Sequence, residues 1–463
     1  MSESATMVRQ EAAPPASAPL ALRMARAIAR YGTANVSPAA AQKVKICLLD
    51  FLACAFEAHS LPWARQAQAL ATDGAGPCTI VGTSLKVPTG DAAFANSVAG
   101  HGLVREDMHT GSVSHLGIIV MPELLALSQE RKVDGKAFIA AAIVGYEVGG
   151  RVGRALITPE FSRFFRPTGF VGPLAGAAAS GHLLRFDEAK IASALSLAAN
   201  MAAGQNQWPH TGADDMFFEA GMASRNGLVA ARLAGLGAYG SDKALDGEAG
   251  LLPAYRPDHS APDVRLFDGE PEIMSVFFKP VPVCNFAQTP ALAALALAKE
   301  EKVDPNAIAS VTVKATRAAK AYPGCDYAGP FSRVLQAKMS IHYAVAGALI
   351  NRKIDESTYR RLDDAAHMAL AAKVTVEVDP GLTAAFPAKQ GAEVVVKLKD
   401  GKVLSRRLAD VIPADIDLIR RRFGEAASAV IGADAARKLE AAVDGLDASA
   451  DVGAVMRLTA AAG

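Results

Sequence analysis

The chain has 463 residues, more than one hydrophobic core ordinarily serves, so we expect two domains. Its 48 basic and 47 acidic residues leave a net charge of +1, which gives no reason to expect a nucleic acid or an anionic membrane as partner. No apolar run reaches the roughly 18 uncharged residues that a membrane span needs. The five cysteines are odd in number and form no C-x-x-C pair, which favours a reducing, cytoplasmic compartment over a disulfide framework.

The N-terminal segment, residues 1–19, is expected to be a disordered arm. It contains acidic and basic residues but neither the apolar segment nor the cleavage pattern of a signal peptide. Helical spacing begins directly after it, because Leu20, Met24 and Ile28 recur at four-residue intervals and Gly32 ends the pattern. The arm therefore precedes a helical domain.

Helical patterns continue through the first half of the chain. Ser37 as N-cap and Pro38 in the first turn open a helix with an almost wholly apolar C-terminal half. Residues 136–150 and 170–184 are rich in alanine and glycine, which favours buried helices packed at short distance. Only the short run CTIVG (78–82) is typical of a strand.

Strand patterns dominate the later part of the chain. Three β-branched runs predict strands at 308–316, 373–379 and 392–408, the last with Asp400-Gly401 as a hairpin turn. A helix is expected between them at 337–354, and helical spacing returns after residue 408. We therefore predict a smaller α+β lid domain over 269–408. The helical body then comprises 20–268 and 409–463 and is discontinuous.

The densest group of titratable residues lies between His101 and Pro122, in HGLVREDMHTGSVSHLGIIVMP. It holds three of the nine histidines together with an arginine, a glutamate and an aspartate. Such groups between two segments that need burial are costly unless they are solvated, paired or used. Surrounding glycines and serines indicate a loop, and functional residues concentrate on loops held by a rigid scaffold. We take this stretch as the candidate site, with a solvated connector as the alternative.

The same stretch, with the segment DAAFANSVAG before it, resembles the MmgE/PrpD family. The resemblance continues in GYEVGGRVGRAL, FFRPTGFVGPLAGAAASGHLL, GMASRNGLVAARLAGLG and FKPVPVC, and so covers nearly the whole chain from about residue 20. It implies a mostly α fold with a smaller α+β lid domain and an active site in the cleft between the two. It also implies a homodimer, no metal and no cofactor. The activities of the family are 2-methylcitrate dehydratase, cis-aconitate decarboxylase and iminodisuccinate epimerase.

Site residues follow from the resemblance position by position. Expected catalytic residues are Asp107, His115 and Lys279, and expected substrate-binding residues are Arg105, His109, Arg166 and Tyr343. The chain departs from the family at two cationic positions, since Arg166 stands where relatives carry a histidine and Met216 where they carry a lysine. These departures leave both the substrate and the reaction open.

Those side chains suit chemistry beside a carboxylate. Proton abstraction alpha to a carboxylate needs a base, for which His115 and Asp107 qualify, and the resulting enediolate needs positive charge from Lys279 or Arg166. Guanidinium groups grip carboxylates in bidentate fashion, so Arg105 and Arg166 suit a di- or tricarboxylate. Arginine stays charged at every working pH, which predicts a carboxylate affinity almost flat from roughly pH 6 to 8.

We therefore expect a metal-independent lyase, of the dehydratase or decarboxylase class, that acts on a small di- or tricarboxylate. An isomerase or epimerase of a polycarboxylate is the first alternative, and a degenerate family member acting only as a binding protein is the second. A two-histidine, one-carboxylate metal site of Asp107, His109 and His115 is less favoured, because the spacing matches no metal-binding signature.

Overall fold

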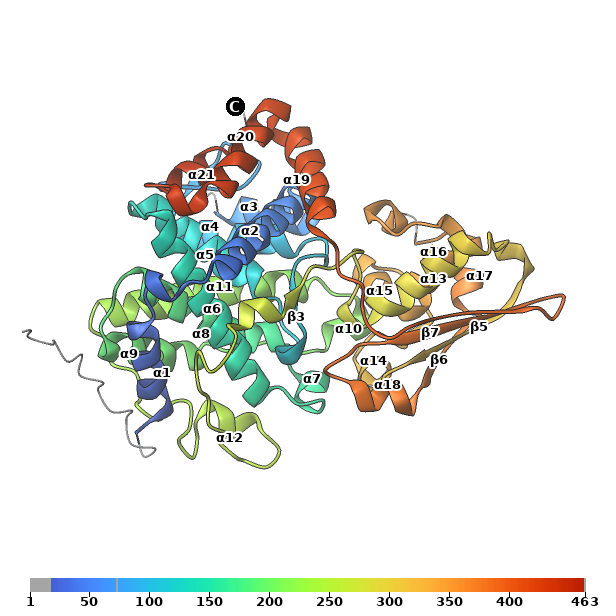
Figure 1. Cartoon of the computed structure of the whole chain (residues 1–463), viewed down its shortest axis with the longest axis horizontal. Helices are drawn as coiled ribbons and strands as arrows, with labels where there is room; N and C mark the ends of the chain where they lie inside the picture. Colours follow the sequence, from blue (N-terminus) through green and yellow to red (C-terminus); the bar gives the residue numbers. More distant parts are fainter. Residues whose placement is uncertain (1–17, 72–73, 361, 462–463) are drawn as a thin grey trace, which may run out of the picture.

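The computed structural model describes residues 18–71, 74–360 and 362–461. Nearly all of the predicted N-terminal arm lies outside these residues. The described chain forms a large group of helices and a smaller part built on a four-stranded sheet (Figure 1). The predicted fold class, mostly α with a smaller α+β part, is confirmed.

The helical body is built from long helices in which alanine and glycine keep the axes close together. Its principal helices are α1 (Leu20–Arg30), α2 (Pro38–Ala58), α3 (Pro62–Ala71), α4 (Thr89–His101), α5 (Gly117–Glu130), α6 (Gly135–Leu156), α8 (Pro167–Leu183), α9 (Glu188–Ala199) and α11 (Asp215–Gly235). Short helices α7 (Phe161–Phe164), α10 (Trp208–Thr211) and α12 (Leu251–Tyr255) connect them, and the predicted strand at 78–82 is the two-residue β1 (Cys78–Thr79), paired with β2 (Lys86–Val87).

Helix α6 shows why glycine is needed. A Cβ on Gly145 would lie 2.7 Å from Val120 of α5, and one on Gly149 would lie 2.5 Å from Leu116 and 3.1 Å from Ala175 of α8. Any larger residue would force α5 and α8 away from α6. The glycines therefore fix the position of the N-terminal end of α5, which the candidate loop immediately precedes.

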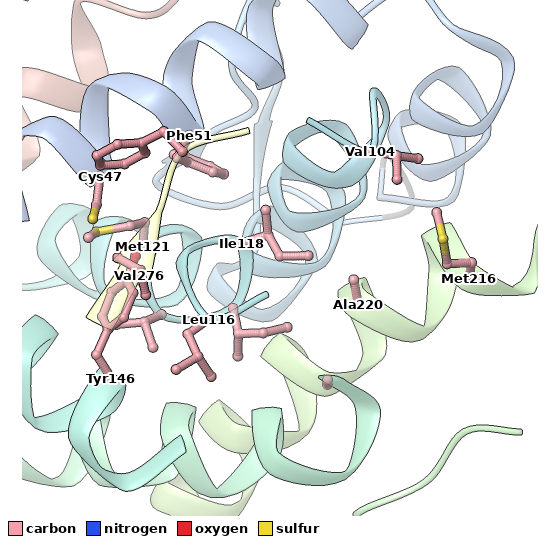
Figure 2. Close-up of a cluster of buried hydrophobic side chains, with 14 of the residues drawn as sticks. Cys47, Phe51, Val104, Leu116, Ile118, Met121, Tyr146, Met216, Ala220 and Val276 are labelled. Carbon is pink, nitrogen blue, oxygen red and sulfur yellow. The ribbon is translucent and has the colours of Figure 1, made fainter. Parts of the chain in front are cut away.

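A buried hydrophobic cluster supports that end of α5 (Figure 2). Leu116 and Ile118 lie between Tyr146 of α6 and Ala220 of α11, and all four side chains are at most 2% exposed. Val104 belongs to the same core. The candidate loop thus rests on a close-packed base that limits its freedom.

The α+β part contains a sheet of order β6-β5-β7-β8, with β5 parallel to β6 and antiparallel to β7. Its strands are β5 (Ile308–Ala315), β6 (Val374–Val378), β7 (Ala392–Leu398) and β8 (Val403–Leu408), and its helices are α13 (Gln288–Glu300), α14 (Arg317–Ala321), α15 (Val334–Met339), α16 (Ile341–Asn351), α17 (Ala365–Ala371) and α18 (Pro380–Ala385). The predicted β7–β8 hairpin is confirmed, and Gly401 takes the positive φ of 92° that its turn requires. The helix expected at 337–354 is interrupted at Ser340, whose hydroxyl caps α16 by accepting from the Tyr343 amide at 3.0 Å.

After the sheet, the chain returns to the helical body. Helices α19 (Ile416–Ile431), α20 (Ala433–Asp444) and α21 (Gly453–Arg457) lie beside α2 and α5 (Figure 1). This return is what a discontinuous body requires, while the exact boundaries at residues 268 and 408 stay a prediction. Across the described ranges, no helix combines the length and apolar character needed to cross a bilayer.

Candidate active site

The candidate loop is joined to the segment that leads into the lid. Its strand β3 (Met108–His109) pairs with β4 (Val276–Phe277), with Met108 opposite Phe277. Two residues after β4, the Nζ atom of Lys279 donates to the carbonyl oxygen of Val104 at 2.9 Å. Residues more than 170 positions apart are thereby held at one place.

Glu106 is the centre of a buried polar cluster. One of its carboxylate oxygens, Oε1, lies 2.6 Å from Nδ1 of His101 and 2.9 Å from Nδ1 of His115. On its other side the His101 ring meets Arg166, whose Nη2 lies 3.0 Å from His101 Nε2. Because a guanidinium can only donate, His101 Nε2 must accept and its Nδ1–H must donate to Glu106. Arg166 therefore donates a hydrogen bond to His101, and His101 in turn donates one to Glu106.

His115 presents one ring nitrogen to this cluster and the other to a cavity. Its Nδ1 lies 3.1 Å from the Asp107 carbonyl oxygen as well as 2.9 Å from Glu106, and both atoms are acceptors, so Nδ1 carries the proton. Among the described residues Nε2 has no hydrogen-bond partner. Burial, reinforced by the charge of Lys279, lowers the pKa of His115 to about 3. His115 is thus a neutral imidazole with an unprotonated Nε2 in the cavity.

Charges in the cluster compensate one another. Burial opposes ionisation of Glu106, but His101, Lys279 and His115 outweigh it and hold the pKa of the carboxyl well below its usual range. Burial lowers the pKa of Lys279, and Glu106 opposes that shift. Burial also raises the pKa of Glu219, which lies 3.9 Å from Arg166, to about 7. Two cations, Lys279 and Arg166, therefore line the cavity, and the carboxyl groups of Glu106 and Glu219 lie behind its lining residues.

The cavity itself lies between the helical body and the α+β part and has a volume of about 20 Å³. It brings together His115, Lys279 and Arg166, three of the residues predicted from the sequence. Met216, at the position where the family carries a lysine, also lines it. The remaining walls are Val104, Met108, Val113, Cys284, Asn285, Phe286, Tyr322 and Met339.

Asp107 lies beside the cluster but does not line the cavity. Its Oδ2 accepts from the Tyr146 hydroxyl at 2.5 Å and its Oδ1 from the Gly117 amide at 3.1 Å. A Cβ on Gly117 would approach Asp107 Oδ1 to 2.7 Å, so glycine is needed for this contact. Burial raises the Asp107 pKa to about 6, with the Tyr146 and Gly117 hydrogen bonds opposing the shift. Its carboxylate holds the start of α5 rather than facing the cavity.

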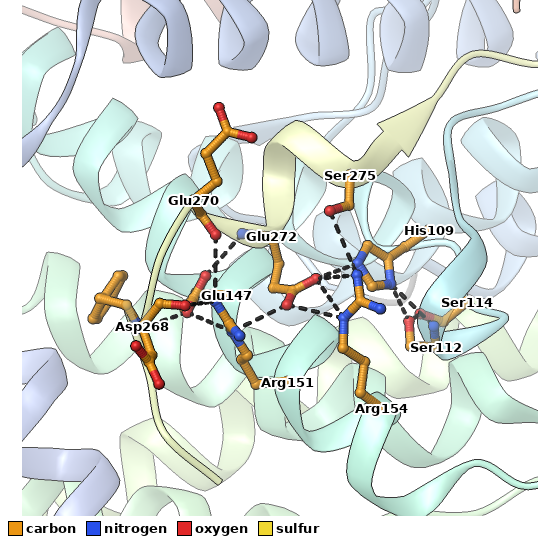
Figure 3. Close-up of polar contacts among 11 residues, drawn as sticks. His109, Ser112, Ser114, Glu147, Arg151, Arg154, Asp268, Glu270, Glu272 and Ser275 are labelled. Carbon is orange, nitrogen blue, oxygen red and sulfur yellow. Dashed lines mark hydrogen bonds and ion pairs between the residues drawn. The ribbon is translucent and has the colours of Figure 1, made fainter. Parts of the chain in front are cut away.

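His109 faces away from the cavity, into the polar network of Figure 3. Its Nε2 lies 2.7 Å from Glu272 and its Nδ1 lies 2.7 Å from the Ser112 hydroxyl. Glu272 is also paired with Arg151 and Arg154 of α6, each at 3.0 Å from Oε1 (Figure 3). This network fastens the strand before Lys279 to the helical body.

Arg105 and Tyr343 also lie outside the cavity. Arg105 pairs with Glu57 at 2.6 Å and lines a separate crevice beside α19. The Tyr343 hydroxyl donates to the Thr358 carbonyl oxygen at 3.0 Å, and its ring stacks on His367 with centroids 3.8 Å apart. The structure thus separates these two side chains from His115, Lys279 and Arg166.

Two residues of the cluster were not assigned a role from the sequence. His101 and Glu106 lay within the stretch that the sequence singled out, but nothing in their spacing indicated that they would share a hydrogen bond with each other. Tyr322, from the α+β part, also lines the cavity and had no signal in the sequence. In the described part of the chain, no three His, Cys, Asp or Glu side chains are grouped to hold a metal ion. The candidate trio Asp107, His109 and His115 takes three different sets of partners.

Comparison with known proteins supports the same two-part architecture and an enzymatic site. Residues 22–262 match the MmgE/PrpD N-terminal domain and residues 281–448 the MmgE/PrpD C-terminal domain, so the chain belongs to the MmgE/PrpD family and is an enzyme. The cis-aconitate decarboxylase-like protein oryM of Aspergillus oryzae is 28% identical over 90% of this chain and 92% of its own length. Human cis-aconitate decarboxylase is 27% identical over 70% of this chain and 68% of its own length. Cis-aconitate decarboxylase of Aspergillus terreus is 32% identical, over 44% of this chain and 43% of its own length. These relatives support a function of the lyase, decarboxylase type.

Proposed function

We propose that this enzyme is a lyase that decarboxylates a small di- or tricarboxylate, with the carboxylates held by Arg166 and Lys279 and the proton moved by His115. The observation that carries the proposal is the free Nε2 of His115 in the cavity that Lys279 and Arg166 also line. The names of the relatives favour decarboxylation over dehydration.

The chemistry follows from these charges. When carbon dioxide leaves, the electron pair of the broken C–C bond passes to the carbon it leaves and is delocalised into a neighbouring carboxylate as an enediolate. Lys279 stabilises that charge, and a proton then replaces the lost carboxyl group. Neutral His115 relays this proton, while Glu106 at 2.9 Å stabilises the imidazolium formed in transit. Arg166 orients the substrate, as a guanidinium does for carboxylates.

Other predicted site residues take supporting roles in this proposal. Asp107 fixes the start of α5, and His109 fixes the strand before Lys279, so both position the reacting groups without touching substrate. Arg105 pairs with Glu57 within the helical body, and Tyr343 bonds to Thr358 within the α+β part, so neither contacts substrate in this proposal. The proposal therefore places the direct contacts to substrate on His115, Lys279 and Arg166.

We also propose that the enzyme is a cytoplasmic homodimer. Met222, Val229, Leu233 and Leu236 recur on one side of α11 and its C-terminal end and are 37–86% exposed, which favours burial against a second copy. All five cysteines are free, which supports a reducing compartment. The net charge of +1 gives no reason to expect a nucleic acid as partner, and no helix in the described ranges is long and apolar enough to cross a bilayer.

One assay in heavy water tests the reaction type. Cis-aconitate and related acids are incubated with the enzyme, and products are analysed by mass spectrometry for deuterium and mass loss. Deuterium incorporation with loss of carbon dioxide supports the decarboxylase. Incorporation with loss of water identifies a dehydratase, and exchange without mass loss an isomerase. Binding without any exchange would overturn the enzymatic assignment of the cavity and leave a binding protein.

A further inference from the structure

Two of the five cysteines face each other in the α+β part. Sγ of Cys284 lies 3.7 Å from Sγ of Cys325, although the two residues are 41 positions apart in the sequence. Both side chains are buried and both thiols are free. A disulfide bond is about 2.05 Å long, so the two sulfur atoms, already in contact, need only a small further approach to form one.

The backbone holds this pair of thiols in place. The amide of Cys284 donates to the carbonyl oxygen of Lys338 at 2.8 Å, and the carbonyl oxygen of Cys325 accepts from the Ile341 amide at 2.9 Å. Lys338 and Ile341 lie on the two sides of the junction between α15 and α16. One short segment therefore fixes both cysteines, and their contact is a property of the fold.

One of the two thiols faces the candidate active-site cavity. Cys284 lines the cavity together with Lys279 and Arg166, whereas Cys325 lies behind it and is fully buried. The hydrogen bond from Cys325, together with the charges of Lys279 and Arg166, lowers the pKa of Cys284 although burial opposes the shift. Burial and the hydrogen bond to Cys284 raise the pKa of Cys325. Cys284 is thus the more acidic thiol, and the thiolate is the reactive form of cysteine.

The size of the cavity restricts which oxidants reach Cys284. Its volume of about 20 Å³ is close to the roughly 10–15 Å³ that one water molecule needs. Hydrogen peroxide is only slightly larger than water, whereas oxidised glutathione is far larger. The other three thiols are buried, their pKa values are raised chiefly by burial, and they do not line the cavity: Cys47, Cys54 and Cys78.

We propose that Cys284 and Cys325 form a dithiol that hydrogen peroxide oxidises, in which Cys284 reacts first and Cys325 resolves the product. The Cys284 thiolate attacks one peroxide oxygen. An S–O bond forms as the O–O bond breaks, and the leaving hydroxide takes up the proton that the thiol released, which gives water. Cys284 is then a sulfenic acid.

The second step closes the disulfide. The Cys325 sulfur attacks the sulfur of the sulfenic acid, an S–S bond forms as the S–O bond breaks, and the hydroxide leaves with the Cys325 proton as water. The two thiols lose two electrons in total, and one peroxide is reduced to two waters. A dithiol reductant reverses the bond by exchange. This chemistry does not depend on which acid the enzyme converts.

Mass spectrometry of the full-length enzyme after treatment with hydrogen peroxide provides the test. Remaining thiols are alkylated under denaturing conditions before digestion. We expect a linked pair of peptides that contains Cys284 and Cys325, lighter by two hydrogen atoms than the two thiol peptides together. Dithiothreitol should remove it. Cys47, Cys54 and Cys78 should be alkylated with and without peroxide.

Variants separate the two roles. Cys325→Ser should stop at the sulfenic acid, which dimedone then labels on Cys284. Cys284→Ser should leave Cys325 as a thiol at the same peroxide dose, because Cys325 does not face the cavity. Cys78→Ser is the matched control, since this buried thiol lies outside the pair, and it should still form the linked peptides.

The wild-type result decides the proposal even where a variant fails to fold. Two unmodified thiols at a peroxide dose that fully oxidises free glutathione would overturn it. Equal oxidation of Cys47, Cys54 and Cys78 would also overturn it, because the reaction would then not depend on the cavity. Dimedone labelling of Cys325 in the Cys284→Ser variant would contradict the assigned order of reaction.

Discussion

Glu106 Oε1 lies 2.9 Å from His115 Nδ1, with both side chains at most 6% exposed. This contact orients the ring so that Nε2 faces the cavity, and it places a negative charge where an imidazolium would form. A carboxylate in this position stabilises the protonated ring and fixes its tautomer. Glu106 is therefore a positioning residue for the proposed proton transfer, and it predicts a specific kinetic effect.

Glu106→Gln should lower kcat by roughly 10- to 100-fold with little change in KM, because the amide keeps the shape but not the charge that stabilises the imidazolium. Steady-state kinetics over pH 5 to 9 provide the measurement. Glu106→Asp should restore part of the rate, since it restores the charge. An equal loss in the Asp and Gln variants would indicate a purely structural role.

His115→Ala should reduce turnover at least ~100-fold, the usual scale of a general acid–base contribution. Since the pKa of His115 is lowered to about 3, the ring is already neutral at every pH above roughly 4. The wild-type rate should therefore show no acid limb from this group between pH 5 and 8. His210→Ala, on an exposed part of α10, is the control and should keep full activity. Near-normal turnover of His115→Ala would remove it from the mechanism.

Carboxylate affinity should fall as pH rises through 7, because Glu219 has a pKa of about 7 and gains its charge beside Arg166. This expectation replaces the flat profile that Arg166 alone suggested. The change should be roughly threefold to tenfold, as expected when a nearby like charge costs about 1 kcal/mol. Calorimetric titration with the preferred acid at pH 6 and 8 measures it.

Glu219→Gln is the control and should bind equally well at both pH values. Arg166→Ala should weaken binding by roughly 2–5 kcal/mol if the guanidinium pairs with a buried carboxylate. An unchanged dissociation constant in Arg166→Ala would mean that substrate does not contact this residue.

Glu123 should make the protein less stable as pH rises from about 5 to 8. It is buried between α5 and α8, where desolvation raises its pKa to about 8, with the hydrogen bond from Ser180 opposing the shift. Since the folded carboxyl binds a proton that the unfolded one has lost above pH 4.5, unfolding becomes easier by up to about 1.4 kcal/mol per pH unit.

Urea denaturation across this pH range measures the slope. Glu123→Gln should remove its contribution. Glu130→Gln, at the exposed end of the same helix, is the control for replacing a glutamate in α5. Parallel slopes for wild type and Glu123→Gln would show that Glu123 is ionised in the fold.

The exposed apolar side of α11 predicts a dimer. Light scattering at micromolar concentration should give twice the chain mass of 48.0 kDa. Leu233→Glu and Leu236→Glu should shift the mass toward the monomer, because a charge would be buried in the contact. Leu70→Glu, at another exposed leucine, is the control. A mass near 48.0 kDa for the wild type would exclude the dimer.

The sequence predicts the elements well where local signals are strong. Asp400-Gly401 identified the β7–β8 hairpin, and Ser37-Pro38 the start of α2, because turns and caps depend on residues a few positions apart. Ser340 was missed as an interruption, since serine inside an apolar helical pattern is compatible with either continuation or capping. The sheet order could not be predicted, because β5 pairs with strands more than 60 positions away.

Site residues were harder to predict, because the type of a residue does not determine where its side chain points in the fold. Asp107, His109 and His115 lie within nine positions of one another, yet their side chains meet Tyr146, Glu272 and Glu106 respectively. Positive φ at Val104 and at Val113, 58° and 50°, bends the loop between them in a way that β-branched residues seldom adopt. The local composition therefore predicted where the candidate loop lies, whereas the partners of its titratable side chains became apparent only from the fold.

Because β3 pairs with β4, the residues proposed to carry out the chemistry are held together independently of the wall that controls access to the cavity. Lys279 follows β4, donates to the Val104 carbonyl oxygen, and has its own carbonyl oxygen held by Arg422 of α19 at 3.0 Å. This lysine is therefore fastened to the helical body, although the predicted lid domain, residues 269–408, includes it. Phe286 and Tyr322 form part of the wall that the α+β part contributes to the cavity. A swing of that wall would open the cleft and leave the spacing of His115 and Lys279 intact, so the enzyme need not reassemble its proton-transfer machinery at every turnover.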